Sequence, residues 1–181
     1  AFEDDRFGRD KTRIHYHVYS KDLRRMIGIS REYLPSLPGN SGRQSGIQLL
    51  HHPSGGVIAV WLEKTGTHNA LAYTHIYNGS VRTPVEMISG LEDFQRVELA
   101  LAKGALYAVW EGENEAEEAV LFMAKMPLDA LGTCKRMYAV APNGQQREPH
   151  FVQVGADKLG LVYSETAENG DDVLKLKWLV R

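Results

Sequence analysis

Three arginines stand at or near the start of predicted apolar strands, and they are the best candidates in the chain for binding an anion. Arg43 precedes one such strand, Arg96 a second and Arg147 a third. A guanidinium group donates paired hydrogen bonds in one plane, which suits a carboxylate or a sulfate. We therefore predict that Arg43, Arg96 and Arg147 contact an anionic substrate. The alternative is that they are solvated turn residues, or that they pair structurally with Glu98 and Glu148.

Acid–base chemistry has three candidates close to these arginines. His150 lies near Arg147 in the sequence and suits a base that removes a proton next to a carboxylate, with Glu148 as the alternative base. Hydrolysis of an acetal would instead need two carboxyl groups, and Glu98 with Glu148 are the candidates for that role. A hydrated surface without catalytic function is the remaining interpretation.

The other histidines and the acidic loops do not predict a metal site. His15 and His17 share one face of a predicted strand, and His51 adjoins His52. A metal needs three or four converging ligands, whereas the sequence offers only pairs. The acidic loops, at residues 3–5, 111–118 and 165–172, lack the alternating Asp spacing of calcium sites, so we interpret them as solvated hairpin tips. We predict neither a metal nor a cofactor.

The composition is that of a globular protein and excludes several classes. The chain has 181 residues, of which 43% are hydrophobic and 24% charged, enough for one domain with a core. Its 21 basic and 23 acidic residues give a net charge of −2, so no overall field favours nucleic acid or anionic lipid. No apolar run reaches the roughly 20 residues of a membrane-spanning helix. The single cysteine, Cys134, excludes an internal disulfide.

An internal repeat predicts the elements that position these residues. An apolar stretch containing an aromatic residue, Trp61, Trp110 or Tyr163, recurs at intervals of about 50 residues. A tight turn precedes each stretch, and a polar loop with a second apolar stretch follows it. The runs are short, rich in β-branched and aromatic residues and bounded by Gly, Pro and Asn, so we predict strands throughout. Residues 92–102 are the nearest candidate for a helix, but their place in the repeat favours a strand.

Repeats of this length, with three or four strands each, predict the blades of a β-propeller. We place blade parts at residues 1–40, 46–90, 94–141 and 147–181 of one module, which amounts to about 3.5 four-stranded blades. The first part resembles the second half of a repeat, and the last stops after a third strand. Because open sheet edges invite pairing, we expect closure by the two chain ends, by a second copy or by another chain. A β-sandwich with accidental repeats is the alternative.

Three loops resemble those of a known group of propellers. Residues 19–28 resemble the Tyr-Ser-x-Asp-Leu-x-x-Trp-x-Gly stretch of sialidase-like propellers, and residues 127–134 resemble a degenerate Asp-box. Residues 77–84 are similar to the same place in repeats that end in Trp-Ser-x-Pro. Such a box has a structural role, because its polar side chains satisfy turn amides and its aromatic residue plugs the blade edge. The positions at which this chain departs from the preferred aromatic residue are Met26, Val81 and Cys134.

The resemblance implies a sialidase-like, Asp-box β-propeller, similar in layout to propeller polysaccharide lyases and glycosidases. It implies an anionic glycan of uronic or sialic type at the mouth of the channel, and an extracellular or periplasmic location. An enzyme of this kind would be a polysaccharide lyase or a glycoside hydrolase. The alternative is a non-catalytic scaffold that binds other proteins. The half-repeats at both ends, with no initial Met, lead us to expect a removed leader or a longer protein.

Overall fold

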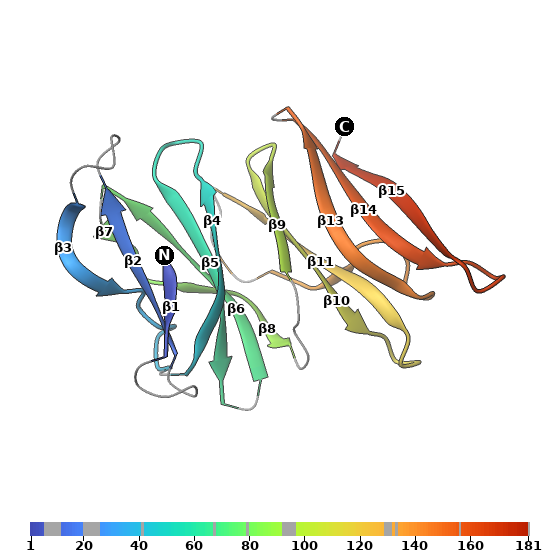
Figure 1. Cartoon of the computed structure of the whole chain (residues 1–181), viewed down its shortest axis with the longest axis horizontal. Coiled ribbons are helices and arrows are strands. Elements are labelled where there is room, and N and C mark those ends of the chain that lie inside the picture. The colour runs from blue at the N-terminus through green and yellow to red at the C-terminus, as the bar shows by residue number, and fades with distance from the viewer. Residues whose placement is uncertain are drawn as a thin grey trace. The chain divides into compact units, whose positions relative to one another are not determined.

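The computed structural model of the chain is built from β-strands (Figure 1). It describes residues 1–5, 12–19, 26–40, 42–66, 68–78, 80–91, 97–128, 132, 134–155 and 157–180. No helix occurs in these residues, which confirms the prediction of an all-β protein. The chain divides into two compact units, Ala1–Glu92 and Asp93–Arg181, which we call unit 1 and unit 2.

Unit 1 contains two antiparallel sheets. Sheet 1 has the order β1-β2-β3, and sheet 2 has the order β4-β5-β6-β7 with β8 also paired to β6. Gly56 makes the β4–β5 turn possible, because its φ is 80° and a Cβ there would lie 2.4 Å from the carbonyl oxygen of Ile76. The strands are β1 Phe2–Asp4, β2 Arg13–Tyr19, β3 Met26–Tyr33, β4 Gln44–His51, β5 Val57–Thr65, β6 His68–Tyr77, β7 Ser80–Val81 and β8 Val85–Leu91.

Unit 2 also contains two antiparallel sheets. Sheet 3 has the order β12-β11-β10-β9, and sheet 4 has the order β13-β14-β15. Lys103 and Gly104 join β9 to β10 with φ values of 45° and 69°, the pair of positive angles that suits a two-residue hairpin. The strands are β9 Val97–Ala102, β10 Ala105–Glu113, β11 Ala119–Pro127, β12 Met137–Tyr138, β13 Gln146–Val154, β14 Lys158–Thr166 and β15 Asp172–Val180.

The sheets follow one another along the sequence, as separate meanders do. Sheets 1 to 4 run through residues 2–33, 44–91, 97–138 and 146–180, close to the four parts predicted from the repeat. The strand predicted in 92–102 is present as β9, although residues 92–96 lie outside the described part of the chain. No sheet closes on itself among the described residues, so the propeller itself stays a prediction.

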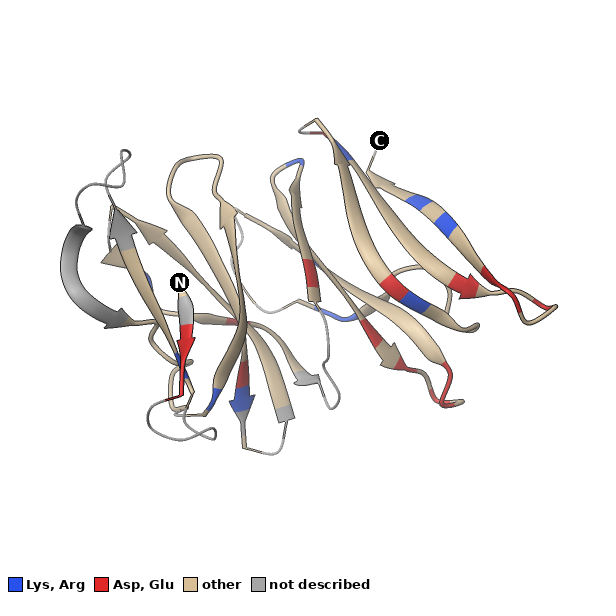
Figure 2. Cartoon of the chain, in the orientation of Figure 1, with Lys and Arg blue, Asp and Glu red and all other residues tan. Residues whose placement is uncertain are grey.

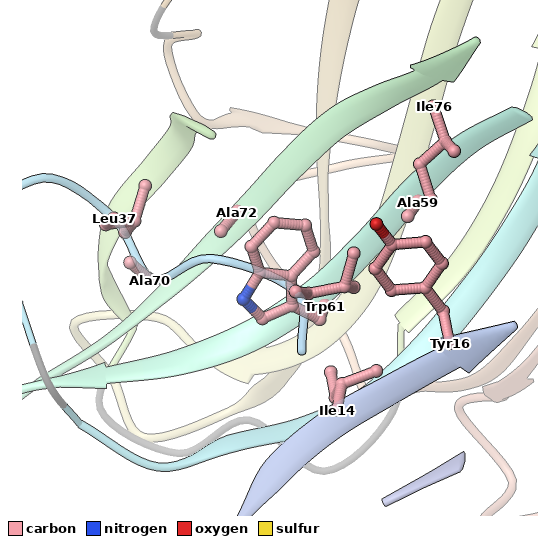
Figure 3. Close-up of a cluster of buried hydrophobic side chains, with 9 residues drawn as sticks. Ile14, Tyr16, Leu37, Ala59, Trp61, Ala70, Ala72 and Ile76 are labelled. Carbon is pink, nitrogen blue, oxygen red and sulfur yellow. The ribbon is translucent and has the colours of Figure 1, made fainter. Parts of the chain in front are cut away.

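The core of unit 1 lies between sheets 1 and 2 (Figure 3). Ile14 and Tyr16 alternate along β2 and point toward Trp61 of β5, whose side chain is fully buried. Ala72 lies beside the indole ring and leaves room for it, whereas Ala59 lies next to Ile76 and Tyr16. Two-residue alternation therefore directs one face of β2 into the core.

The core of unit 2 lies between sheets 3 and 4. Tyr107 of β10 packs in one cluster with Leu159 of β14, and Val109 packs in a second cluster with Leu161 and Tyr163. These residues alternate along their strands, so β10 and β14 each turn one face toward the other sheet. The same face-to-face arrangement therefore occurs in both units.

Polar contacts between the sheets of unit 1 are specific. The Glu3 carboxylate accepts a hydrogen bond of 2.7 Å from the amide of Gly46, within a β-bulge of β4. The side-chain oxygen of Gln44 accepts one of 3.1 Å from the amide of Ile14. The carbonyl of Ile14 in turn accepts from the amide of Leu34, just beyond β3. Sheet 1 is thereby tied to the first strand of sheet 2.

Unit 2 repeats these contacts. The Glu111 carboxylate accepts a hydrogen bond of 2.6 Å from the amide of Glu148, within a β-bulge of β13. The side-chain oxygen of Gln146 accepts one of 3.5 Å from the amide of Leu121, whose carbonyl accepts from the amide of Ala139. Strands β1, β2 and β3 thus correspond to β10, β11 and β12. Sheet 1 accordingly contains the second to fourth strands of a repeat, and sheet 4 contains the first three.

Candidate functional site

Two of the predicted catalytic residues lie together in unit 2. Glu98 comes from β9 and His150 from β13, the first strands of sheets 3 and 4. The imidazole Nδ1 of His150 lies 3.6 Å from the Glu98 carboxylate. The His150 side chain is 54% exposed and the Glu98 side chain 33%, so a solute can reach both. An imidazole and a carboxylate side by side are the kinds of group that general acid–base catalysis uses.

A β-bulge between Arg147 and His150 sets the direction of the neighbouring side chains. Pro149 has no amide to donate to a β-ladder, which favours a bulge at this point. Glu148 adopts a φ of 52°, unusual for a residue with a side chain, and its amide donates to Glu111. Bulges commonly redirect side chains next to functional sites. Glu111 therefore positions the predicted residues from the neighbouring sheet.

Arg147 is exposed at the start of β13. Its backbone carbonyl accepts a hydrogen bond from Ser164, which fixes the main chain there. The guanidinium donates a long bond of 3.4 Å to the side chain of Gln145, itself just before the strand. A guanidinium held this weakly can turn to a carboxylate ligand.

Unit 2 carries many acidic residues. Figure 2 shows acidic residues at the ends of the β10–β11 and β14–β15 hairpins. Glu98 lies 3.6 Å from the His150 imidazole, whereas Glu111 accepts a hydrogen bond from the backbone amide of Glu148.

The remaining predicted arginines lie elsewhere. Arg43 is exposed in unit 1, immediately before β4, where its carbonyl accepts from the amide of Lys64. In the repeat defined by Gln44 and Gln146, the residue corresponding to Arg43 is Gln145, not Arg147. The two arginines thus occupy different positions of the repeat. Arg96 lies outside the described residues.

The histidines of unit 1 form two separate groups. His15 is buried with its Nε2 2.8 Å from the Asp4 carboxylate, and its ring lies against Tyr33. His52 and His75 stack at the β4–β5 turn with ring centroids 4.5 Å apart. Burial, with His75, Arg82 and His51 as further causes, lowers the pKa of His52 from its ordinary value. Among the described residues, no three His, Cys, Asp or Glu side chains are arranged to hold a metal ion.

The sequence interpretation missed Glu111. It assigned this residue to a solvated hairpin tip, whereas Glu111 lies on β10 and bonds to the bulge of β13. The sequence did contain a signal for this role of Glu111. Both Glu3 and Glu111 precede strands that occupy the same position of the repeat, β2 and β11. The predicted Asp-box at 127–134 and the loop at 19–28 include undescribed residues, so their turns are not described.

Comparisons of the chain with protein-family models, with curated proteins and with solved structures found no match to any of them. Within the described residues, no helix has the length and apolarity needed to cross a membrane.

Proposed function

We propose that the protein binds an acidic sugar of a glycan at the group formed by Glu98, Arg147, Glu148 and His150. The observation that carries the proposal is the exposed His150–Glu98 pair, which lies on the first strands of adjacent sheets with Arg147 on the same bulged strand. A guanidinium that makes only a long bond to Gln145 can take a sugar carboxylate in its place.

The same group supports β-elimination better than hydrolysis. Arg147 would neutralise the carboxylate of a uronic residue, which acidifies the neighbouring C–H bond. His150 would take that proton. The electron pair of the broken C–H bond would form a C=C bond, and the C–O bond to the leaving sugar would break. His150 would then return this proton to the oxygen of the leaving sugar, and Glu98 would orient the imidazole for both transfers. A hydrolase would instead use Glu98 and Glu148 as its two carboxyl groups.

We propose further that the four sheets are blades of the propeller type, as the sialidase-like resemblance implies. Two observations support this. Each sheet is a small antiparallel meander. The same contact between sheets also occurs in both units: a glutamate accepts a hydrogen bond from the amide of a bulge, and a glutamine side chain accepts one from the amide of a third strand of the repeat. Blades of a propeller repeat their contacts in this way.

The test is binding to an immobilised uronic polymer and to its neutral analogue. We expect Arg147→Ala to weaken binding by about tenfold or more, because it removes a charge-assisted pair. Arg82→Ala, in unit 1, is the matched control and should bind as the natural chain does. His150→Gln should keep binding but abolish the ultraviolet absorbance of unsaturated uronate. Equal binding by the Arg147→Ala and natural chains would refute the proposed site.

A non-catalytic scaffold is the second candidate function. The exposed apolar side chains of sheet 4 favour it, because such surfaces commonly mark protein contacts. A scaffold would leave every polymer intact while Arg147→Ala changed nothing. The two functions therefore separate in the same assay.

A further inference from the structure

The turn between β4 and β5 of sheet 2 (Figure 1) is held by a histidine that accepts a hydrogen bond. Nδ1 of His52 accepts a bond of 3.1 Å from the amide of Ser54, two residues ahead. Asparagine and aspartate side chains make the same contact in Asx turns, and the intervening Pro53 sets the backbone angle that turns of this kind favour. Backbone bonds close the turn, from the Gly55 amide to the His52 carbonyl and from the His52 amide to the Gly56 carbonyl.

The contact with Ser54 fixes where His52 can take a proton. A neutral imidazole carries its proton on one nitrogen and offers the other nitrogen as an acceptor. Because Nδ1 of His52 accepts from the Ser54 amide, the proton of the neutral ring is on Nε2. A second proton can then add only to Nδ1, where it removes the acceptor and sets two donors against each other. A charged His52 is therefore incompatible with the bond to Ser54.

His75 of β6 responds in the opposite way. Its ring stacks on that of His52 with the centroids 4.5 Å apart, and its Nε2 lies 2.9 Å from the carbonyl oxygen of Gly55. A carbonyl oxygen can only accept, so His75 donates through Nε2 and keeps this bond after taking a proton on Nδ1. The Tyr77 ring covers the same glycine, since a Cβ on Gly55 would lie 3.2 Å from it. The second half of the turn thus stays anchored when the histidines are charged.

The charged groups around His52 oppose its protonation. His51 precedes it on β4, whereas His75 and Arg82 are neighbours across the β6–β7 hairpin, where the Arg82 amide donates to the His75 carbonyl. Each of the three carries or can take a positive charge. Tyr77 is a further titratable side chain at this turn, with its ring centroid 6.0 Å from that of His75. Burial lowers the pKa of His52, and the three basic neighbours lower it further.

We propose that the β4–β5 turn is a pH-sensitive switch, in which a proton on Nδ1 of His52 releases the Ser54 amide and opens the first half of the turn, residues 52–54. The sign of the switch follows from the acceptor role, because the closed form needs the neutral ring. The turn is closed above pH 6.5 and opens as the pH falls through the lowered pKa of His52. The switch lies in unit 1 and does not depend on the glycan site of unit 2.

The experiment is NMR of the intact chain across the titration of His52, which the imidazole nitrogen shifts report. Exchange of the Ser54 amide with water is measured at the same pH values, and each rate is divided by the intrinsic rate of an unstructured amide. We expect the protection of Ser54 to fall at least about fivefold when His52 is charged, the change that loss of one hydrogen bond produces. The Lys64 amide, bonded to the Arg43 carbonyl at the other end of the hairpin, is the internal reference and should keep its protection.

Three variants separate the switch from a general effect of acid. His52→Asn keeps an acceptor for the Ser54 amide but cannot take a proton, so its protection should agree at both pH values to within a factor of about two. His52→Ala removes the acceptor, so Ser54 should be unprotected at both. His51→Asn is the matched control, because His51 is exposed and adjacent, and it should keep the natural response.

Two results would overturn the proposal. One is a Ser54 amide in the natural chain that keeps its protection after His52 has become charged. The other is a His52→Asn chain that loses protection at Ser54 as the natural chain does, since that loss could not come from a proton on residue 52.

Discussion

Glu63 of unit 1 and Glu165 of unit 2 occupy the same position of the repeat. Each is paired across the sheet with the glutamine at the start of the first strand, Gln44 or Gln146. Glu63 is fully buried. Its carboxylate accepts hydrogen bonds from the Trp61 indole, the Leu37 amide and Asn40. Glu165 is 24% exposed and pairs with Lys175 instead.

The difference shows that the same pairing of strands can place its glutamate in two different electrostatic environments. A buried carboxylate needs several donors, because each lost water must be replaced. The loop through Leu37 and Asn40 supplies those donors in unit 1. A partly exposed carboxylate such as Glu165 needs only a lysine and water, and its ion pair contributes little to stability. We therefore expect the units to respond unequally to the same substitution.

The largest expected effect comes from Glu63→Ala. The change leaves the Trp61 N–H and the Leu37 amide buried without an acceptor, which should destabilise unit 1 by about 3 kcal/mol. Glu165→Ala, the matched change, should cost unit 2 less than about 1 kcal/mol. Hydrogen exchange of the intact chain, followed by mass spectrometry, reports the two units separately. Similar losses in the two units would contradict the comparison.

A second pair of substitutions should show equality. Glu3→Ala and Glu111→Ala each remove the acceptor of a bulge amide, at distances of 2.7 Å and 2.6 Å. We expect each to destabilise its own unit by about 1 kcal/mol. The same exchange measurement applies. If only one unit responds, the two contacts are not equivalent and the correspondence of strands fails.

The smallest expected effect is a difference in pH dependence. Burial lowers the pKa of His52 below 6.5, so the unfolded chain binds that proton more readily. Its contribution to stability is present above pH 6.5 and is lost as the pH falls through the lower folded-state value. Burial, and then Glu165, raises the pKa of Tyr163 above 10.0, and the hydrogen bond to Glu165 raises that of Lys175. Their contribution is present below pH 10 and is lost above it.

Melting temperatures across pH test this difference. His52→Gln should flatten the acid side of the profile, and Tyr163→Phe should flatten the alkaline side. Neither variant should affect the opposite side. A His52→Gln chain that loses stability on acidification as steeply as the natural chain would show that other groups carry the acid response.

Much of the fold was predictable because it depends on local signals. Short apolar runs between glycine turns predicted strands, and recurrence of Trp61, Trp110 and Tyr163 predicted the order of the sheets. The site was predictable only in part. Glu98 and His150 were named as candidates, and they do lie together. Arg43 and Arg147 were grouped because each lies near the start of a strand, whereas the pairing of Gln44 and Gln146 shows that the two arginines occupy different positions of the repeat.

The sequence by itself determined the all-β class and the sequence of meanders, because residue alternation and turn residues act within a few positions of the chain. Only the tertiary structure decided the roles of the carboxylates. Glu63 became a buried acceptor, Glu165 a partly exposed partner of Lys175, and Glu111 a support for the bulge at Glu148. The physical reason is that burial and hydrogen-bond partners come from strands and loops distant in sequence, and these set the cost of each charge.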